Sequence, residues 1–324
     1  MAGNIASVLL WVCAVDFRTF IASRVVGGLS EGNVQLATSM ATDVSDPASR
    51  GSTMALVGAC FSIAYTFGPM LGARLASIPS VDANPFATAA AVSLALIVVE
   101  TVYIYFALPE TLPALNRSTS IDDKNSIPVT TTQPPPLTRK NSHLVLNTVH
   151  FLFLLFFSGM ESSLSFMTYD LFAFSSANNG RLLGYIGLVA SLFQGAVTRR
   201  LPPLHSVRLG ILSCLVAFVA LARVSTVSGL YLAATLLAVT SATVVTGLNA
   251  LSSLEAGAGE RGGKLGTLRA WGQLGRALGP VLFTSVYWWA GRTTAYTIGA
   301  TGIAVVAAIS LSGLRLPASP LKQA

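Results

Sequence analysis

The amino-acid sequence predicts an all-α membrane protein whose chain crosses the bilayer many times. Of its 324 residues, 52% are hydrophobic and only 10% are charged, whereas a soluble domain carries roughly 25% charged residues. The apolar residues also recur in stretches long enough to cross a bilayer core about 30 Å thick. Most of the protein surface must therefore face lipid.

Nine stretches have the length of about 20 mostly apolar residues that a membrane span needs. They lie near 20–41, 53–75, 85–107, 147–169, 181–198, 207–223, 228–250, 265–290 and 293–314. A shorter apolar run, Ile5 to Val15, has no Lys or Arg before it, although a signal peptide would begin with a positive segment. We therefore expect Met1 to fall inside a helix of a longer parent sequence.

A polar segment divides the chain. Residues 109–146 are rich in Ser, Thr, Asp and Pro, and such a composition buries too little apolar surface to order itself. We predict a flexible cytoplasmic linker there. The linker separates a partial N-terminal half at 1–108, with the helix stub and three spans, from a six-helix C-terminal half at 147–316 and a cytoplasmic tail at 317–324.

The Lys and Arg residues that flank the spans indicate the orientation, because cytoplasmic loops carry an excess of both. One side of the membrane would hold Arg18, Arg74, Arg181, Arg223 and Arg292. The other would hold Arg50, Arg117, Lys124, Arg139, Lys140, Arg199, Arg200, Arg208, Arg261, Lys264, Arg269, Arg315 and Lys322. The second, larger group includes the linker and the C-terminal tail, which are therefore predicted to be cytoplasmic.

Several function classes find no support in the sequence. The net charge of +7 comes from basic residues that stand singly between apolar runs, so no nucleic-acid partner is expected. The three Cys and three His residues have no metal-ligand spacing, and no metal or cofactor is predicted. The chain also lacks the G-x-x-x-x-G-K-[ST], H-E-x-x-H and G-x-S-x-G motifs of common enzymes. We expect no enzyme activity, and an ion gradient as the source of energy.

The chain contains an internal repeat. Arg50-Gly51 opens an apolar stretch that reaches Gly68-Pro69-Met70-Leu71, and Arg261-Gly262 opens one that reaches Gly279-Pro280-Val281-Leu282. The offset, 261 − 50 = 211 residues, is the same for the matched Arg, Gly, Gly, Pro and Leu. This register favours two homologous halves around a central loop, which is a known transporter architecture.

Four short segments follow one another along the chain: Arg24-Val25-Val26-Gly27-Gly28, Gly68-Pro69-Met70-Leu71-Gly72, Leu108-Pro109-Glu110-Thr111-Leu112 and Gly195-Ala196-Val197-Thr198-Arg199-Arg200. In this order they resemble motifs of the major facilitator superfamily, and within it of the tetracycline-transporter-like branch of drug:proton antiporters. The motifs are, in turn, the fourth-helix motif, the G-P-x-x-G-G antiporter motif (with Ala73 in place of the last Gly), the exit from helix six and the G-x-x-x-D-R loop motif (with Thr198 in place of the acid). The family's first two helices have no counterpart here. The resemblance implies a bundle of two pseudo-symmetric helical halves that lacks those two helices.

The span 20–41 carries a polar stripe. Arg24, Gly28, Glu31, Gln35 and Thr38 are spaced so that one face of a helix holds them all. Because a charge inside a membrane costs at least about 2.5–3.5 kcal/mol, such residues are functional candidates. We interpret Arg24 and Glu31 as proton-coupling residues and Gln35 and Thr38 as part of a substrate cavity. The alternative is that a neighbouring helix simply satisfies Glu31.

The spans 147–169 and 265–290 carry comparable faces. Glu161 is a second candidate proton carrier, with Ser165 on its face. Arg276 lies deep in its span and is predicted to meet an anionic substrate or to pair with Glu161. Further substrate-cavity candidates are Gln194, Asn249 and Gln273. Glu100 has few polar neighbours, and a functional and a structural role are equally consistent with its position.

The remaining candidates are structural or gating residues. Gly272, Gly275 and Gly279 form a small-residue stripe that suits close helix packing. Gly68-Pro69 and Gly279-Pro280, with Gly28 and Gly72, are predicted to bend or pack helices. The candidate gating-loop residues are Arg50, Arg199, Arg200 and Arg261.

The sequence leaves two functions open. The first is proton-coupled efflux or exchange of a small organic compound, such as a drug-like molecule, an organic anion or a metabolite, by alternating access. In that case the partners are the lipid bilayer, the substrate and protons. The second is a truncated membrane protein or scaffold that does not transport.

Overall fold

The structure is a computed structural model that describes residues 1–46, 48–76, 78, 84, 86–108, 141–257 and 260–315. Helices and the short connections between them make up this described part, and it contains no strand. They form two compact units. The N-terminal unit comprises Met1–Asp43 and Phe67–Thr119, and the C-terminal unit comprises Val44–Thr66 and Ser120–Ala324. Most of the predicted linker (109–140) and the tail at 317–324 lie outside the described residues.

The N-terminal unit is built around the short first helix. It contains α1 (Ala2–Val12), α2 (Phe17–Ser30), α3 (Asn33–Asp43), α5 (Ala87–Ala107) and the second part of α4 (Arg50–Ala76). The helix α1 packs against α2 and α5, where the Ser7 hydroxyl donates a 2.7 Å hydrogen bond to the Ser23 carbonyl. The apolar run predicted as a helix stub is thus a helix with partners of its own.

The span predicted at 20–41 is not one continuous helix. The helix α2 ends at Ser30, and α3 begins at Asn33. Between them, Glu31 has ψ 80°, outside the helical region. The sequence Ser30-Glu31-Gly32-Asn33 explains the break, because Gly costs about 1 kcal/mol in a helix interior and Ser and Asn are weak helix formers. The break divides the predicted polar stripe between two helices. The prediction that its residues share one face of a single helix was therefore wrong.

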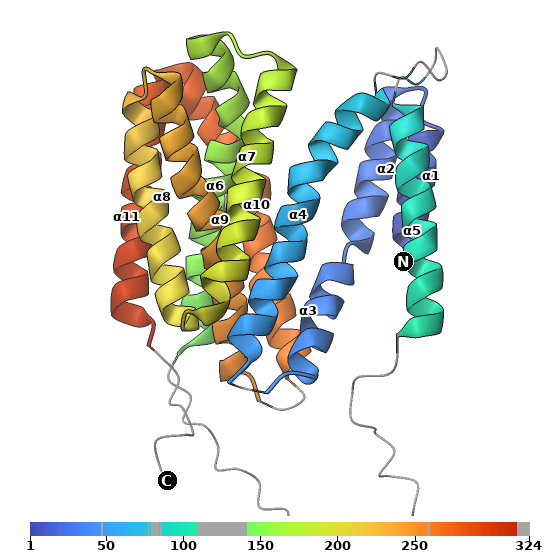
Figure 1. Cartoon of the computed structure of the whole chain (residues 1–324), viewed down its shortest axis with the longest axis horizontal. Helices are drawn as coiled ribbons and strands as arrows, with labels where there is room; N and C mark the ends of the chain where they lie inside the picture. The colour runs from blue at the N-terminus through green and yellow to red at the C-terminus, as the bar shows by residue number, and fades with distance from the viewer. Residues whose placement is uncertain are drawn as a thin grey trace, which may run out of the picture. The chain divides into compact units, whose positions relative to one another are not determined.

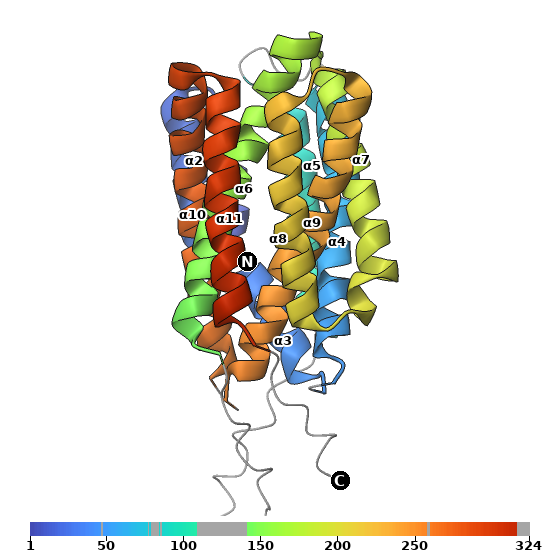
Figure 2. The ribbon, with the colours of Figure 1, turned by 90° about the vertical axis from the view of Figure 1, so that its left-hand side faces the viewer.

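The C-terminal unit is a helical bundle (Figures 1 and 2). It consists of the first part of α4, then α6 (His143–Phe172), α7 (Ser176–Ala196), the 3₁₀ helix η2 (Thr198–Arg200), α8 (Pro203–Arg223), α9 (Val227–Glu255), α10 (Arg261–Ala290) and α11 (Arg292–Gly313). Buried Phe218, Phe283 and Tyr296 bring α8, α10 and α11 together, with ring centroids 5.3–6.1 Å apart. Their mutual contacts supply large apolar area at the centre of the bundle.

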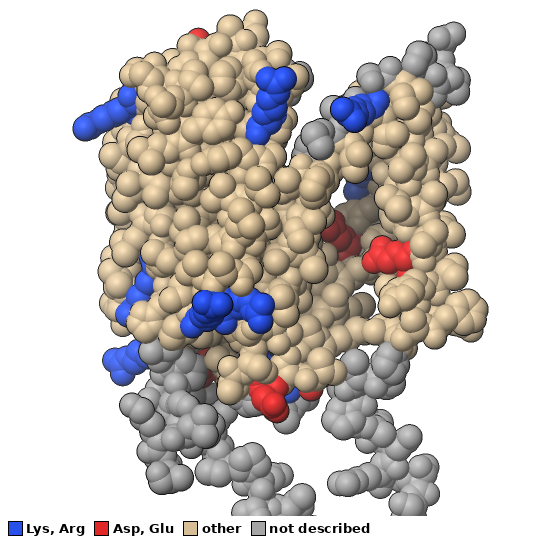
Figure 3. Space-filling model, in the orientation of Figure 1, with Lys and Arg blue, Asp and Glu red and all other residues tan. Residues whose placement is uncertain are grey.

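The prediction of a multi-pass membrane protein is confirmed. Seven helices in the described part of the chain are long and apolar enough to cross a membrane: α4, α5, α6, α7, α8, α9 and α11. The predicted span 265–290 forms most of the helix α10 but is not among the seven. In Figure 3, uncharged residues cover most of the visible surface of the α6–α11 bundle, and the basic side chains lie toward its two ends. This distribution suits helices that face lipid along their length.

The predicted glycine stripe packs α10 against α6. A Cβ at Gly275 would collide with the Phe151 carbonyl oxygen, and one at Gly279 would collide with the Leu155 carbonyl oxygen. Both contacts are with backbone, so neither helix could yield by moving a side chain. The prediction of close packing by these glycines is confirmed. By contrast, a Cβ at Gly68 or Gly72 would meet no described atom within 4 Å, and the side chain of Pro69 lies outside the described part.

Candidate functional site

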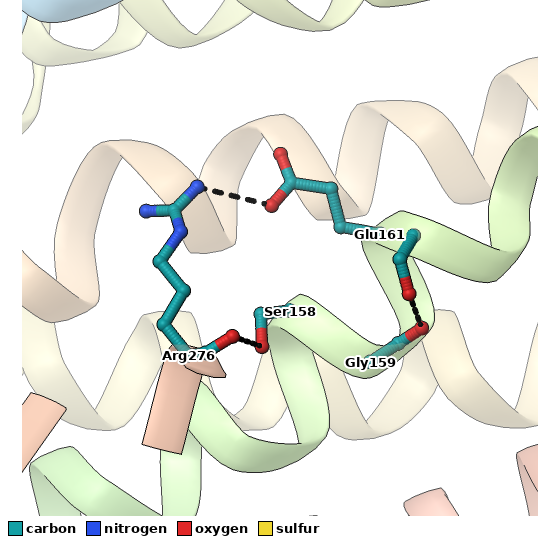
Figure 4. A network of polar contacts seen from close by, with 5 residues as sticks. Ser158, Gly159, Glu161 and Arg276 are labelled. Carbon is teal, nitrogen blue, oxygen red and sulfur yellow. Dashed lines mark hydrogen bonds and ion pairs between the residues drawn. The ribbon is translucent and has the colours of Figure 1, made fainter. Parts of the chain in front are cut away.

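An ion pair joins the middles of α6 and α10 (Figure 4). The Arg276 Nη2 lies 3.3 Å from the Glu161 Oε2. One turn away, the Ser158 hydroxyl donates a 3.3 Å hydrogen bond to the Arg276 carbonyl oxygen. Pairing with Glu161 was one of the two alternatives predicted for Arg276, and the structure shows this contact.

The ion pair remains accessible on one side. The Arg276 side chain is 51% exposed and that of Glu161 is 25% exposed. Ser165, one turn beyond Glu161, and Gln273, one turn before Arg276, are exposed as well. The predicted cavity residues of these two helices therefore lie on the same open faces as the charged pair. The Arg276 side chain is thus only partly covered by its partner.

Two further hydrogen bonds join α6 to its neighbours in the C-terminal unit. The Tyr287 hydroxyl donates a 2.8 Å hydrogen bond to the Asp170 Oδ2, and the Ser163 and Tyr296 hydroxyls lie 3.1 Å apart. Neither pair was predicted, because the partners lie more than 110 residues apart in sequence and no local pattern connects them. Together they hold α6 against α10 and α11 beyond the ion pair.

Gln194 is a buried contact between helices of the C-terminal unit. Its Oε1 accepts a 2.8 Å hydrogen bond from the Ser62 hydroxyl of α4, and only 2% of the residue is exposed. A Cβ at Gly58 would lie 2.5 Å from the Gln194 Nε2 and 2.8 Å from the Thr246 Oγ1. The glycine thus lets α4 approach both residues. Asn249, the other predicted cavity residue of this region, lies half-buried on α9.

The predicted gating residues occupy helix ends. Arg50 and Arg261 are the first residues of α4 and α10, so the repeated motif begins a long helix in both places. Arg50 is buried, and its Nη1 donates a 3.3 Å hydrogen bond to the Ser253 carbonyl oxygen of α9. Arg199 and Arg200 lie exposed in η2.

The polar residues of the N-terminal unit lie on both sides of the helix break. Arg24 and Gly28 lie on α2, and Gln35 and Thr38 lie on α3, where the Thr38 hydroxyl donates to the Val34 carbonyl oxygen at 2.7 Å. The Gln35 Nε2 is buried with no hydrogen-bond partner among the described residues. Glu31, at the break, is exposed, as is Glu100 on α5.

A buried polar cluster fastens three chain segments at one end of the C-terminal unit. The Glu255 Oε1 accepts hydrogen bonds from the Asn141 backbone N–H at 3.2 Å and its Nδ2 at 2.6 Å. The same Nδ2 donates to the Arg315 carbonyl oxygen at 2.7 Å, and the Arg315 backbone N–H donates to the Asn141 Oδ1 at 2.7 Å. Asn141 therefore joins the entry to α6, the end of α9 and the exit from α11. The sequence gives no local signal for this cluster.

We predict that Asn141→Ala destabilises the C-terminal unit. The substitution removes three hydrogen bonds, one of them to the buried Glu255 carboxylate, at a cost of about 1–3 kcal/mol. Thermal unfolding in detergent should show a lowered melting temperature. Asn178→Ala is the matched control, because the Asn178 side chain makes no hydrogen bond in the described part. Equal melting temperatures for the two variants would contradict the role given to Asn141.

Comparison with known protein sequences matches the chain to one family. Residues 1–280 match the model of the Major Facilitator Superfamily. The chain is 35% identical over 316 residues to "Major facilitator superfamily domain-containing protein 10" of Mus musculus, covering 92% of this chain and 67% of that protein. It is likewise 35% identical over 340 residues to the Homo sapiens protein of the same name, covering 99% and 72%.

Solved structures show the same relationship. The "human organic anion transporter MFSD10 (TETRAN)" has a TM-score of 0.80 at 30% identity, and the match covers 95% of this chain and 75% of that one. The E. coli fucose:proton symporter FucP has a TM-score of 0.64 at 15% identity, covering 97% and 84%. At that identity the second likeness concerns the fold alone.

Proposed function

We propose a specific transport activity from one premise: the chain belongs to the major facilitator superfamily. It is an integral multi-pass membrane protein of a transporter family. Our proposal is that it moves small organic anions across the membrane by alternating access and that protons couple to this movement. The single observation that carries the proposal is the accessible Glu161–Arg276 ion pair.

The position of the ion pair supports a functional role. Arg276 and Glu161 lie in the middle of 30-residue helices, where an ionised side chain in a membrane is costly and usually faces a functional site. A guanidinium is also the side chain best suited to a carboxylate, because its planar N–H donors match the two oxygens. The solved relative at 30% identity is described as an organic anion transporter, which agrees with this substrate class.

The geometry suggests how a proton couples to the anion. Glu161 and a substrate carboxylate compete for the same guanidinium, that of Arg276. Protonation of Glu161 removes its negative charge and releases Arg276, so the proton and the anion favour each other's binding. Joint movement of both follows from this linkage. The resemblance to drug:proton antiporters predicts instead that substrate and protons move in opposite directions. The orientation of the pH gradient that stimulates uptake distinguishes joint movement from exchange.

The test is uptake by the purified chain reconstituted into lipid vesicles. We expect saturable uptake of radiolabelled p-aminohippurate, stimulated by an acidic exterior, and no such uptake of its neutral amide. Stimulation by an acidic interior would instead support exchange for protons. Uptake no faster than in protein-free vesicles under both gradients would contradict the proposed function.

A further inference from the structure

The environment of Arg24 in the N-terminal unit differs from that of Arg276. The Arg24 guanidinium carbon lies 4.7 Å from the centroid of the Trp11 ring and 5.4 Å from that of Phe20. Its Nε donates a 3.2 Å hydrogen bond to the Ser23 hydroxyl. No acidic side chain among the described residues pairs with it. We propose that Arg24 is a second anion-binding residue, which holds the carboxylate of the transported compound while Arg276 is paired with Glu161, an inference that rests on the proposed function.

The aromatic contacts orient the guanidinium. Cation–π interaction places the guanidinium over the ring faces of Trp11 and Phe20, so these contacts restrain the long side chain. A guanidinium has five N–H donors, and Ser23 uses only the one on Nε. The donors on Nη1 and Nη2 have no acceptor among the described residues. These two nitrogens lie in one plane and suit a bidentate contact with a carboxylate.

There is space beside this group on the same helix. Gly28 lies one turn after Arg24, is exposed, and a Cβ built on it would meet no described atom within 4 Å. The neighbouring surface is aromatic, because Trp11 and Phe20 both remain partly exposed. A carboxylate on an apolar body fits this combination, with its charge at Arg24 and its body over Gly28 and the rings.

This assignment differs from the proton-coupling role that the polar stripe on the span 20–41 suggested for Arg24. An arginine stays protonated at all physiological pH values, so Arg24 itself carries no proton through the cycle. It supplies a constant positive charge that a substrate anion neutralises. A purely structural alternative is that Arg24 only fastens α2 to Trp11 of α1, and in that case stability rather than affinity would depend on it.

Binding of p-aminohippurate to the purified full chain tests this inference. Arg24→Lys keeps the charge but loses the planar fork, and Gly28→Leu fills the adjacent space while leaving the arginine intact. Each is expected to weaken binding at least about tenfold, as the loss of a charge-assisted contact does.

The controls are Arg18→Lys, which changes an exposed arginine of the first turn of α2, and Gly263→Leu, which changes an exposed glycine of α10 with no described atom near its Cβ position. Both should bind as the wild type does.

The outcomes separate the inference from the proposed function. Loss of affinity in both test variants at an unchanged melting temperature supports the anion-binding role. If Arg24→Lys unfolds, Gly28→Leu alone decides. Wild-type affinity in the folded test variants, or no binding of p-aminohippurate by the wild type, overturns the inference. The proposed function is tested separately, by uptake into vesicles that contain the wild-type chain, and it stands if that uptake is saturable even though the Arg24 and Gly28 variants bind as the wild type does.

Discussion

Vesicles that contain the Glu161→Gln variant should lose accumulation of p-aminohippurate driven by a pH gradient but should still exchange internal for external compound. Glutamine keeps the shape of the side chain and removes its titration, so the proton can no longer release Arg276. The substrate site itself remains. Accumulation and exchange are measured in the same vesicles with radiolabelled compound, and the expected result is a loss of the first with the second close to the wild-type rate.

Two variants at other acidic residues serve as comparisons. Glu100→Gln changes an exposed glutamate of α5 and should leave both measurements unchanged. Glu31→Gln tests the other candidate carrier, at the break between α2 and α3. If gradient-driven accumulation persists at the wild-type rate in both Glu31→Gln and Glu161→Gln, then neither residue couples protons and that assignment is wrong.

The second large effect concerns folding rather than transport. Gly275→Ala adds a Cβ that would collide with the Phe151 carbonyl oxygen and lie 3.0 Å from the Leu155 amide nitrogen. Because both contacts are with the backbone of α6, the helices must separate, and overpacking of this kind costs about 1–3 kcal/mol. Thermal unfolding in detergent should show a clearly lowered melting temperature. Separation of α6 from α10 should also lengthen the Glu161–Arg276 contact and reduce uptake.

The same helix provides a matched control. Gly266 also lies in α10, and a Cβ there would meet no described atom within 4 Å. Gly266→Ala should therefore leave stability unchanged or raise it by up to about 1 kcal/mol, because alanine is the better helix former. A lowered melting temperature in Gly266→Ala equal to that of Gly275→Ala would show that the close approach of α6 and α10 is not what Gly275 provides.

The sequence predicts the helices well where length and composition determine them. Long apolar runs have few alternatives in a membrane, and for that reason the ranges near 85–107 and 293–314 agree closely with α5 and α11. The break at Glu31 and Gly32 was missed because apolar and polar periodicity continues across it. The Gly between Glu31 and Asn33 was the available signal.

The candidate site likewise contains one contact that the sequence predicts, while other contacts could not be predicted. Glu161 and Arg276 were found because each is an isolated charge deep in an apolar span, and opposite charges in lipid tend to pair. The Asn141–Glu255 contact and the Trp11–Arg24 contact could not be found this way. Their partners are brought together by helix packing, 114 residues apart in the first case and on separate helices in the second. Such contacts leave no periodic trace in a single sequence.

We infer that the Glu161–Arg276 pair acts in transport and does more than hold α6 to α10. Exchanging the two residues, in Glu161→Arg/Arg276→Glu, keeps an ion pair between the helices but moves the positive charge to α6. Uptake of p-aminohippurate by this double variant, measured beside its melting temperature, separates the two roles. We expect a melting temperature closer to wild type than that of Arg276→Glu alone, with uptake still absent. Uptake restored to the wild-type rate along with stability would contradict it, because a purely structural ion pair tolerates reversal.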